Sequence, residues 1–197
     1  MIKERFISYV EESIRNNWEK EALSNYREKG YTYREIAGIM VRQHMAFREY
    51  GIREGDMIAL LGRNSANWCA MYLAIVTYGA VVVPILPDFK PDDLHNIINH
   101  SDSKILFADD KLWESLEPEK VKGLQCVKSL DTFEMLMSRS EKITEIYGSL
   151  DGKFAQAYPA FSPADIRFSG IDNEKLAVLS YTSGTTGFSK GVMIPHR

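Results

Sequence analysis

The sequence predicts an α/β protein with a doubly wound, largely parallel sheet. Short apolar runs that suit strands buried on both faces alternate along the chain with segments of helical periodicity. Their spacing leaves room for a crossover helix between successive strands, as parallel pairing requires. Of the 197 residues, 45% are hydrophobic and 26% are charged, a composition typical of a folded globular protein.

Charge balance and cysteine content argue against several other classes of protein. The 24 Lys and Arg residues are outnumbered by 27 Asp and Glu, and no basic segment favours a nucleic-acid partner. Neither Cys69 nor Cys126 has the spacing of a disulfide framework or of a metal site. The charged first residues lack the apolar core of a signal peptide. We therefore expect a cytoplasmic protein.

The N-terminal segment is expected to be a helical lead-in to the sheet. Residues 1–30 are polar and partly helical in pattern. Thr32 and Glu35 have the spacing of a capping box, in which each side chain accepts a hydrogen bond from the other residue's backbone. The helix that begins there keeps apolar residues at helical spacing as far as Tyr50, and Gly51 can end it.

The next segment predicts two central strands joined by a helix. Residues 57–61 form a continuous apolar run that suits a buried strand. Asn64 or Ser65 can cap the helix that follows, and residues 80–86 form the second strand-like run. We assign residues 51–197 to an α/β domain and residues 1–50 to the lead-in.

The stretch from 68 to 86 has no charged residue and is long enough to cross a membrane. Gly79 can end a helix, and the β-branched residues and Pro84 after it favour a buried strand instead. We therefore expect no transmembrane span, while peripheral contact with a membrane stays open. A membrane-associated structural protein built on this stretch is the alternative.

The alternation of strand and helix continues for two more strands. Asp131 and Glu134 have the spacing of a further cap and predict a helix through Met137. Residues 139–173 show little periodicity and several glycines and prolines, so we expect a long surface excursion with a short helix at most. The other expected elements are strands at 104–108, 125–130, 176–181 and 192–194, and helices at 92–100 and 112–116.

Residues 181–191, Tyr-Thr-Ser-Gly-Thr-Thr-Gly-Phe-Ser-Lys-Gly, form a loop suited to a polyanion. Glycines let the backbone turn its N–H groups toward one point, and hydroxyl groups add donors. Lys190 adds a positive charge, and a charge-assisted hydrogen bond contributes about 1.5–3 kcal/mol. The candidate phosphate-binding residues are Thr182, Ser183, Gly184, Thr185, Thr186, Gly187 and Lys190.

Two other interpretations of this loop are weaker. A flexible Gly/Ser linker is allowed by composition, but strand-like runs flank the loop on both sides. A Walker P-loop needs Ser or Thr directly after its lysine and a helix beyond. Here Gly191 follows Lys190, and the next residues are strand-like.

The loop resembles the signature loop of the adenylate-forming superfamily, which includes acyl-CoA synthetases, peptide-synthetase adenylation domains and luciferases. The one departure is Ser189, where the family has proline. Further resemblances precede the loop, at the Thr32 helix start, at residues 51–60 and at residues 64–84. The region from Asn64 to Phe89 is most similar to long-chain fatty acid–CoA ligases.

This resemblance implies that a carboxylic acid attacks the α-phosphate of ATP, giving an acyl-adenylate and pyrophosphate. Coenzyme A then takes the acyl group. By resemblance, residues 182–187 and Lys190 hold the β- and γ-phosphates, Lys190 acts in catalysis, and Thr182 helps to place Mg²⁺. The implied substrate is a long-chain fatty acid, with an aryl or amino acid as the alternative.

Family members carry further motifs that bind ribose and supply a catalytic lysine in a C-terminal domain, and these are absent here. We therefore expect a fragment of a larger ligase, without carboxylate-dependent pyrophosphate exchange of its own. A noncatalytic module that binds nucleotide or phosphate is the alternative. The oligomeric state is not predicted.

Several other residues are given structural roles. We expect His95 and His100 to lie solvated on a polar helix face. Trp68, Trp113 and Cys69 fall at positions that favour packing. His196 follows the exit strand, where the family often has a histidine near the acyl pocket, and a structural role is an equal alternative.

Overall fold

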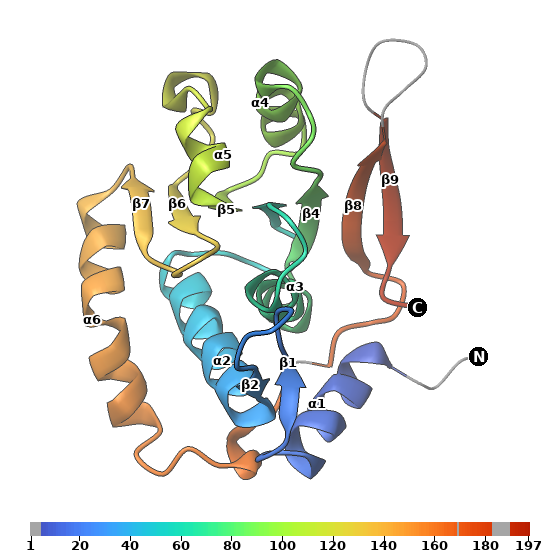
Figure 1. Ribbon diagram of the computed structural model, residues 1–197, viewed down its shortest axis with the longest axis vertical. Helices are drawn as coiled ribbons and strands as arrows, with labels where there is room; N and C mark the ends of the chain where they lie inside the picture. The colour runs from blue at the N-terminus through green and yellow to red at the C-terminus, as the bar shows by residue number, and fades with distance from the viewer. Residues whose placement is uncertain (1–4, 169, 183–189) are drawn as a thin grey trace.

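The computed structural model describes residues 5–168, 170–182 and 190–197. Its main sheet has seven strands in the order β7-β6-β5-β3-β4-β8-β9 (Figure 1). Neighbouring strands from β6 to β8 run parallel, whereas β7 and β9 pair antiparallel at the two edges. The predicted α/β class and largely parallel sheet are confirmed. The strands are β3 (Met57–Leu61), β4 (Val81–Ile85), β5 (Ile105–Ala108), β6 (Cys126–Ser129), β7 (Met135–Ser138), β8 (Leu176–Thr182) and β9 (Lys190–Pro195).

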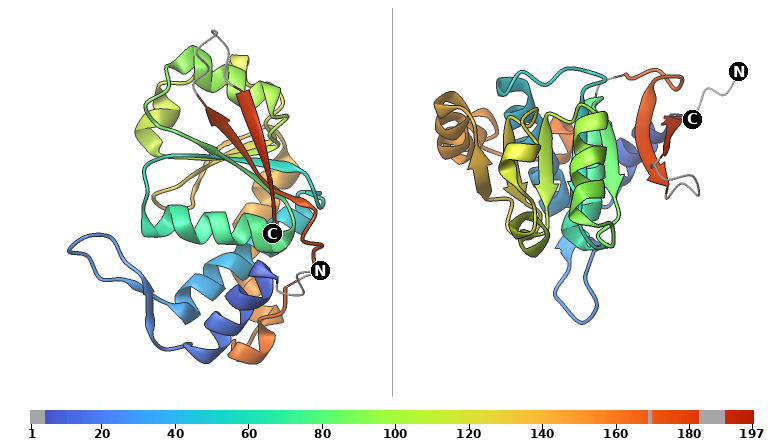
Figure 2. Two further views of the ribbon diagram at one scale, coloured as in Figure 1. Left: turned by 90° about the vertical axis from the view of Figure 1, so that its right-hand side faces the viewer. Right: turned by 90° about the horizontal axis from the view of Figure 1, so that it is seen from above.

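Helices cover both faces of the sheet, which lies as a middle layer between them (Figure 2). Because strand side chains alternate in direction, Leu60 packs with α2 and α3 while Leu61 packs with α4. Each face therefore has its own apolar core. The helices are α2 (Tyr33–Glu49), α3 (Ala66–Tyr78) and α6 (Glu141–Ala157) on one face, and α4 (Pro91–His100) and α5 (Asp110–Glu114) on the other.

The chain begins with α1 (Phe6–Asn16) and a small hairpin of β1 (Glu21–Leu23) and β2 (Tyr31–Thr32), which forms a sheet of its own. The predicted capping box at the start of α2 is confirmed. Thr32 Oγ1 accepts from the Glu35 N–H at 3.2 Å, and Glu35 Oε2 accepts from the Thr32 N–H at 2.7 Å.

The uncharged stretch folds as a helix and then a strand, as expected. Ser65 is the cap of α3, because its Oγ accepts from the Trp68 N–H at 3.1 Å. The helix ends at Gly79, whose φ of 94° is easily adopted only without a Cβ, and β4 follows. No helix in the described part of the chain is long and apolar enough to cross a membrane.

The predicted helix from Asp131 to Met137 is wrong. Ser129 Oγ accepts from the N–H groups of Asp131 and Thr132, at 3.1 and 3.0 Å, which turns the chain back on itself. Residues 135–138 then form β7, antiparallel to β6. The pairing is irregular, with a register shift between Val127 and Lys128 of β6, and Met135 and Met137 accordingly pack against opposite cores.

The expected surface excursion after residue 139 is also wrong over its first half. The helix α6 runs for 17 residues and packs alongside α2 (Figure 1). Gly148 and Gly152 suggested a loop, but no atom lies within 4 Å of an added Cβ at either position. Its buried residues recur at helical spacing and are Ile143, Ile146, Leu150 and Phe154. Two short 3₁₀ helices, η1 (Pro118–Lys120) and η2 (Pro163–Asp165), complete the described elements.

Candidate phosphate-binding site

The candidate site lies where β8 reaches the carboxyl edge of the parallel strands. Ligands of open α/β sheets bind at this edge, outside the carboxyl ends of the strands. β8 lies beside β4 and ends at Thr182, and β9 returns antiparallel from Lys190 (Figure 1). The strand pair therefore brings both ends of the predicted loop to one place.

Two of the predicted phosphate-binding residues are described by the structure. Thr182 and Lys190 are register partners across β8 and β9, and both are exposed. A hydroxyl donor and a cation thus stand side by side at the base of the loop. The remaining candidates, Ser183, Gly184, Thr185, Thr186 and Gly187, lie outside the described residues.

Tyr181 anchors the base of the loop to the neighbouring helix. It is 4% exposed, and its hydroxyl lies 2.6 Å from Nδ1 of His100, the last residue of α4. The two rings meet edge to face with centroids 5.8 Å apart. Burial raises the pKa of Tyr181, so the phenol keeps the proton that its hydroxyl can donate. The sequence alone does not predict this contact, because the two residues are far apart in the chain.

Gly191 permits close pairing of the two strands. A Cβ at this position would lie 2.9 Å from Cδ1 of Leu179 and 3.5 Å from Cζ of Tyr181. A larger residue would therefore displace Leu179 from beside the anchoring tyrosine. The glycine after the lysine thus has a packing role in addition to any role in the loop.

A site for Mg²⁺ built from protein groups alone is not present in the part of the chain that the structure describes. Those residues hold no cluster of three or more His, Cys, Asp or Glu that could bind a metal ion. Thr182 offers one neutral hydroxyl, and Mg²⁺ in nucleotide sites commonly takes further ligands from phosphates and water. The donor set at Thr182 therefore fits a metal ion that arrives with its nucleotide.

The four histidines differ in their surroundings. His196 is 8% exposed, and neither of its ring nitrogens has a hydrogen-bond partner among the described residues. It follows Pro195, the residue of β9 that pairs with Leu176 at the start of β8. His196 therefore lies at the opposite end of this strand pair from Thr182, and burial lowers its pKa.

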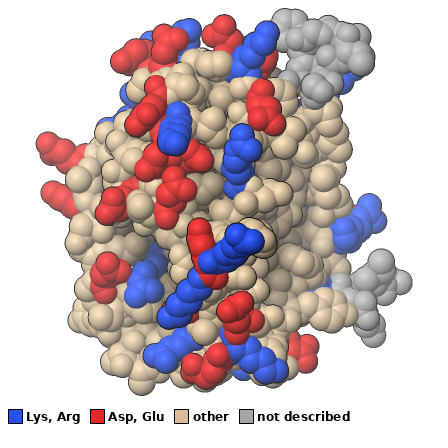
Figure 3. Space-filling view, in the orientation of Figure 1, with Lys and Arg blue, Asp and Glu red and all other residues tan. Residues whose placement is uncertain are grey.

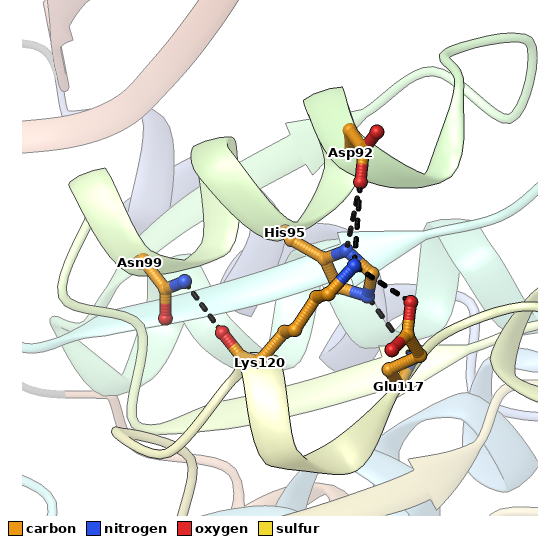
Figure 4. Close-up of polar contacts among 5 residues, drawn as sticks. All are labelled: Asp92, His95, Asn99, Glu117 and Lys120. Carbon is orange, nitrogen blue, oxygen red and sulfur yellow. Dashed lines mark hydrogen bonds and ion pairs between the residues drawn. The ribbon is translucent and has the colours of Figure 1, made fainter.

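The expectation that His95 is solvated is wrong. It is 4% exposed, and its Nε2 accepts from the Glu117 N–H at 3.0 Å (Figure 4). The Nζ atom of Lys120 lies 2.7 Å from a Glu117 oxygen and 3.6 Å from an Asp92 oxygen. The η1 segment covers this side of α4, so the ring is buried against it. The exposed His100 and the packed Trp68 and Trp113 agree with the sequence analysis.

Charges on the described surface are mixed. Lys and Arg alternate with Asp and Glu over the face that Figure 3 shows, without a basic stripe. Several of them form exposed pairs, such as Arg34 with Glu19 and Lys175 with Glu54. This surface gives no support to a nucleic-acid partner.

Comparisons with known proteins give consistent results. A family model described as "AMP-binding enzyme" matches residues 10–197. The chain is 30% identical over 175 residues to 4-hydroxybutyrate–CoA ligase 2 of Metallosphaera sedula, covering 87% of this chain and 31% of that protein. It is 30% identical over 168 residues to a long-chain-fatty-acid–CoA ligase of Thermus thermophilus, covering 84% of this chain and 28% of that protein.

Solved structures share the fold. The anthranilate CoA ligase AuaEII, in complex with anthranoyl-AMP, superimposes with a TM-score of 0.75 at 20% identity, over 98% of this chain and 34% of that one. The long-chain-fatty-acid-CoA ligase FadD1 of Archaeoglobus fulgidus gives a TM-score of 0.72 at 22% identity, over 99% of this chain and 37% of that one. The chain thus spans about a third of the length of these proteins.

Proposed function

The chain belongs to the AMP-binding enzyme family, and on this premise we propose that it supplies the phosphate-binding part of an adenylate-forming ligase. The pairing of Thr182 with Lys190 at the carboxyl edge of the sheet carries the proposal. A loop that starts and ends on paired strands has a fixed base. Thr182 and Lys190, which the strand pair holds side by side, can therefore meet a polyphosphate without a large ordering cost of their own.

In the proposed reaction a carboxylate oxygen attacks the α-phosphorus of ATP, and pyrophosphate leaves. The thiol of coenzyme A then attacks the acyl carbonyl, and AMP leaves. Residues 182–187 and Lys190 hold the β- and γ-phosphates and neutralise the charge that collects on the leaving pyrophosphate. The Thr182 hydroxyl would be a protein ligand of Mg²⁺, which would supply further neutralisation of the phosphate charge. Tyr181 and His100 keep the base of the loop in position.

We propose a long-chain fatty acid as the acid substrate. The name of the Thermus thermophilus relative supports this class, and coenzyme A appears in the names of both relatives described above. An aryl acid is the second candidate, because the structure with the highest TM-score given above is an anthranilate CoA ligase. The cytoplasm, as the compartment of soluble ATP and coenzyme A, is proposed as the location.

The division into a lead-in at residues 1–50 and an α/β part from residue 51 also stays a proposal. Its support is that the main sheet begins at Met57, whereas β1 and β2 form a separate sheet. The lead-in then serves to place α2 against the sheet.

The test is exchange of labelled pyrophosphate into ATP, measured with the protein that contains this chain and with single added acids. We expect palmitate to support exchange at least tenfold above the no-acid background, and benzoate and amino acids to stay near it. Exchange with an aryl or amino acid alone would overturn the proposed substrate. No exchange with any acid would overturn the ligase itself.

A further inference from the structure

Lys128 is a buried cation that the proposed phosphate site does not use. It lies on β6, where it is 1% exposed, and its side chain faces the layer formed by α2 and α6. Its Nζ donates to Oε1 of Gln43 on α2 at 3.1 Å, and Gln43 is itself 4% exposed. A lysine is seldom buried this fully without a carboxylate partner.

The ammonium group of Lys128 has spare capacity for hydrogen bonding. It lies 5.6 Å from the ring centroid of Phe107 and 5.4 Å from that of Tyr147, and it forms no ion pair with a described carboxylate. An ammonium group has three N–H donors, and Gln43 takes one of them. Burial lowers the pKa of Lys128 to about 8, so the group is mostly charged at pH 7.

A cavity of about 340 Å³ lies next to this lysine, between α2 and α6. Its lining includes the polar side chains of Lys128 and Gln43. It also includes the apolar side chains of Ile39, Phe133 and Leu150. Pockets of this size hold small organic molecules. The cavity therefore combines apolar surface with a cation that has donors to spare.

Charge at the cavity selects the kind of ligand. Arg42 and Asp151 also line the wall, but they neutralise each other through an ion pair of 3.0 Å. Lys128 remains as the uncompensated charge of the described lining. One negative charge on a ligand balances it, whereas a phosphate dianion would leave a charge unpaired and partly desolvated.

We propose that this cavity binds a small organic monocarboxylate. The carboxylate accepts N–H bonds from Lys128, and the apolar body of the ligand lies against Ile39, Phe133 and Leu150. The cavity is remote from Thr182, because β5, β3 and β4 lie between β6 and β8. The site is therefore independent of the phosphate-binding loop, and its failure would leave the proposed ligase function untouched.

The test is calorimetric and NMR titration of the 197-residue chain with benzoate, with benzyl alcohol and inorganic phosphate as comparison ligands. Benzoate should bind saturably and shift the amide signals of Phe133, Gly148 and their neighbours. Benzyl alcohol and phosphate should each bind at least tenfold more weakly. No saturable binding of benzoate, or equal binding of benzyl alcohol, would overturn the proposal.

A matched pair of variants assigns the binding to one lysine. Lys128→Met keeps the length of the side chain and removes its charge, and Lys111→Met makes the same change at an exposed position. We expect benzoate to bind at least tenfold more weakly to Lys128→Met and with unchanged affinity to Lys111→Met. Equal loss in both variants, or in neither, would contradict the proposal.

The pH dependence of benzoate affinity, measured with the unaltered chain, is a second test. It applies even if Lys128→Met does not fold. Gln43 and Arg42 face Lys128 from α2, and Tyr147 and Asp151 face it from α6. The Asp151 carboxylate favours the protonated form of Lys128, whereas the buried Cys126 thiol beside it keeps its proton between pH 7 and pH 9. Benzoate affinity should fall severalfold between pH 7 and pH 9, as the amine loses its proton. A flat profile over this range would exclude Lys128 as the cation that holds the carboxylate.

Discussion

His44 shows how single polar residues in the helical layer are tuned by their surroundings. Its Nε2 lies 2.8 Å from the Ala74 carbonyl and 3.1 Å from the Thr77 hydroxyl, while the ring meets Tyr78 and Phe168 edge to face. The neutral ring donates Nε2–H to the carbonyl. A second proton, on Nδ1, would place a charge among apolar side chains. Burial accordingly lowers the pKa of His44 to about 4.

The chain should therefore lose stability in mild acid. Unfolded histidine titrates near pH 6.5. The contribution of neutral His44 to the free energy of unfolding is therefore complete above that pH and is lost as the pH falls toward about 4. His95, whose pKa burial also lowers, acts in the same direction. We expect urea unfolding to show a loss of up to about 3 kcal/mol from His44 between pH 7 and pH 4.

A histidine-to-glutamine variant tests this assignment. His44→Gln should flatten the profile between pH 6.5 and pH 4, because the titrating group is gone. Equal slopes in the original chain and in His44→Gln would show that other groups cause the acid loss.

The contact between Tyr181 and His100 makes a second prediction for single residues. Tyr181→Phe removes a hydroxyl that lies 2.6 Å from a ring nitrogen while keeping the packed ring. A hydrogen bond of this kind contributes about 1 kcal/mol net, which corresponds to a fall in Tm of about 2–4 °C for a chain of this size. Tyr26, which is 84% exposed, offers the control. Tyr26→Phe should leave Tm unchanged when both variants are measured by calorimetry under the same conditions.

At the scale of elements, α6 and β7 show where local sequence patterns are insufficient. The strand-like and helical runs from 57 to 108 have strong periodicity and Ser65 or Gly79 at their ends, and the structure agrees closely with them. Asp131 and Glu134 also have cap spacing, but the Ser129 hydroxyl bonds nearby N–H groups and makes a turn instead. In α6 the four buried apolar residues recur at helical spacing, but Gly148 and Gly152 on the exposed side led to the prediction of a loop.

The packing of α6 can be tested through its apolar stripe. Ile146 is 7% exposed and belongs to the core cluster that α6 shares with α2, so Ile146→Ala should cost about 2–4 kcal/mol of unfolding free energy. Thr144→Ala, on the exposed side of the same helix, should stay within about 0.5 kcal/mol. Equal, small effects in urea unfolding would favour the surface excursion over a packed helix.

At the scale of the whole molecule, the order of the strands explains why the loop could be predicted from the sequence while the residues that hold its base could not. The alternation of strands and helices predicts a parallel sheet, and the rule for ligand sites then predicts use of its carboxyl edge. Contacts such as that of His100 with Tyr181 depend on β8 returning to lie beside β4, which no local pattern encodes. Lys128 escaped notice for the same reason, since its burial depends on the later helix α6.

The central claim is that the segment between Thr182 and Lys190 binds the phosphates of ATP. The most direct measurement is isothermal titration of the chain with MgATP, for the original sequence, for Lys190→Ala and for the control Lys111→Ala. Loss of one charge-assisted contact of about 1.5–3 kcal/mol predicts that Lys190→Ala binds roughly 10- to 150-fold more weakly. The exposed Lys111 is far along the sequence on α5, so its variant should bind as the original does. Equal affinity of Lys190→Ala and the original chain would contradict the account.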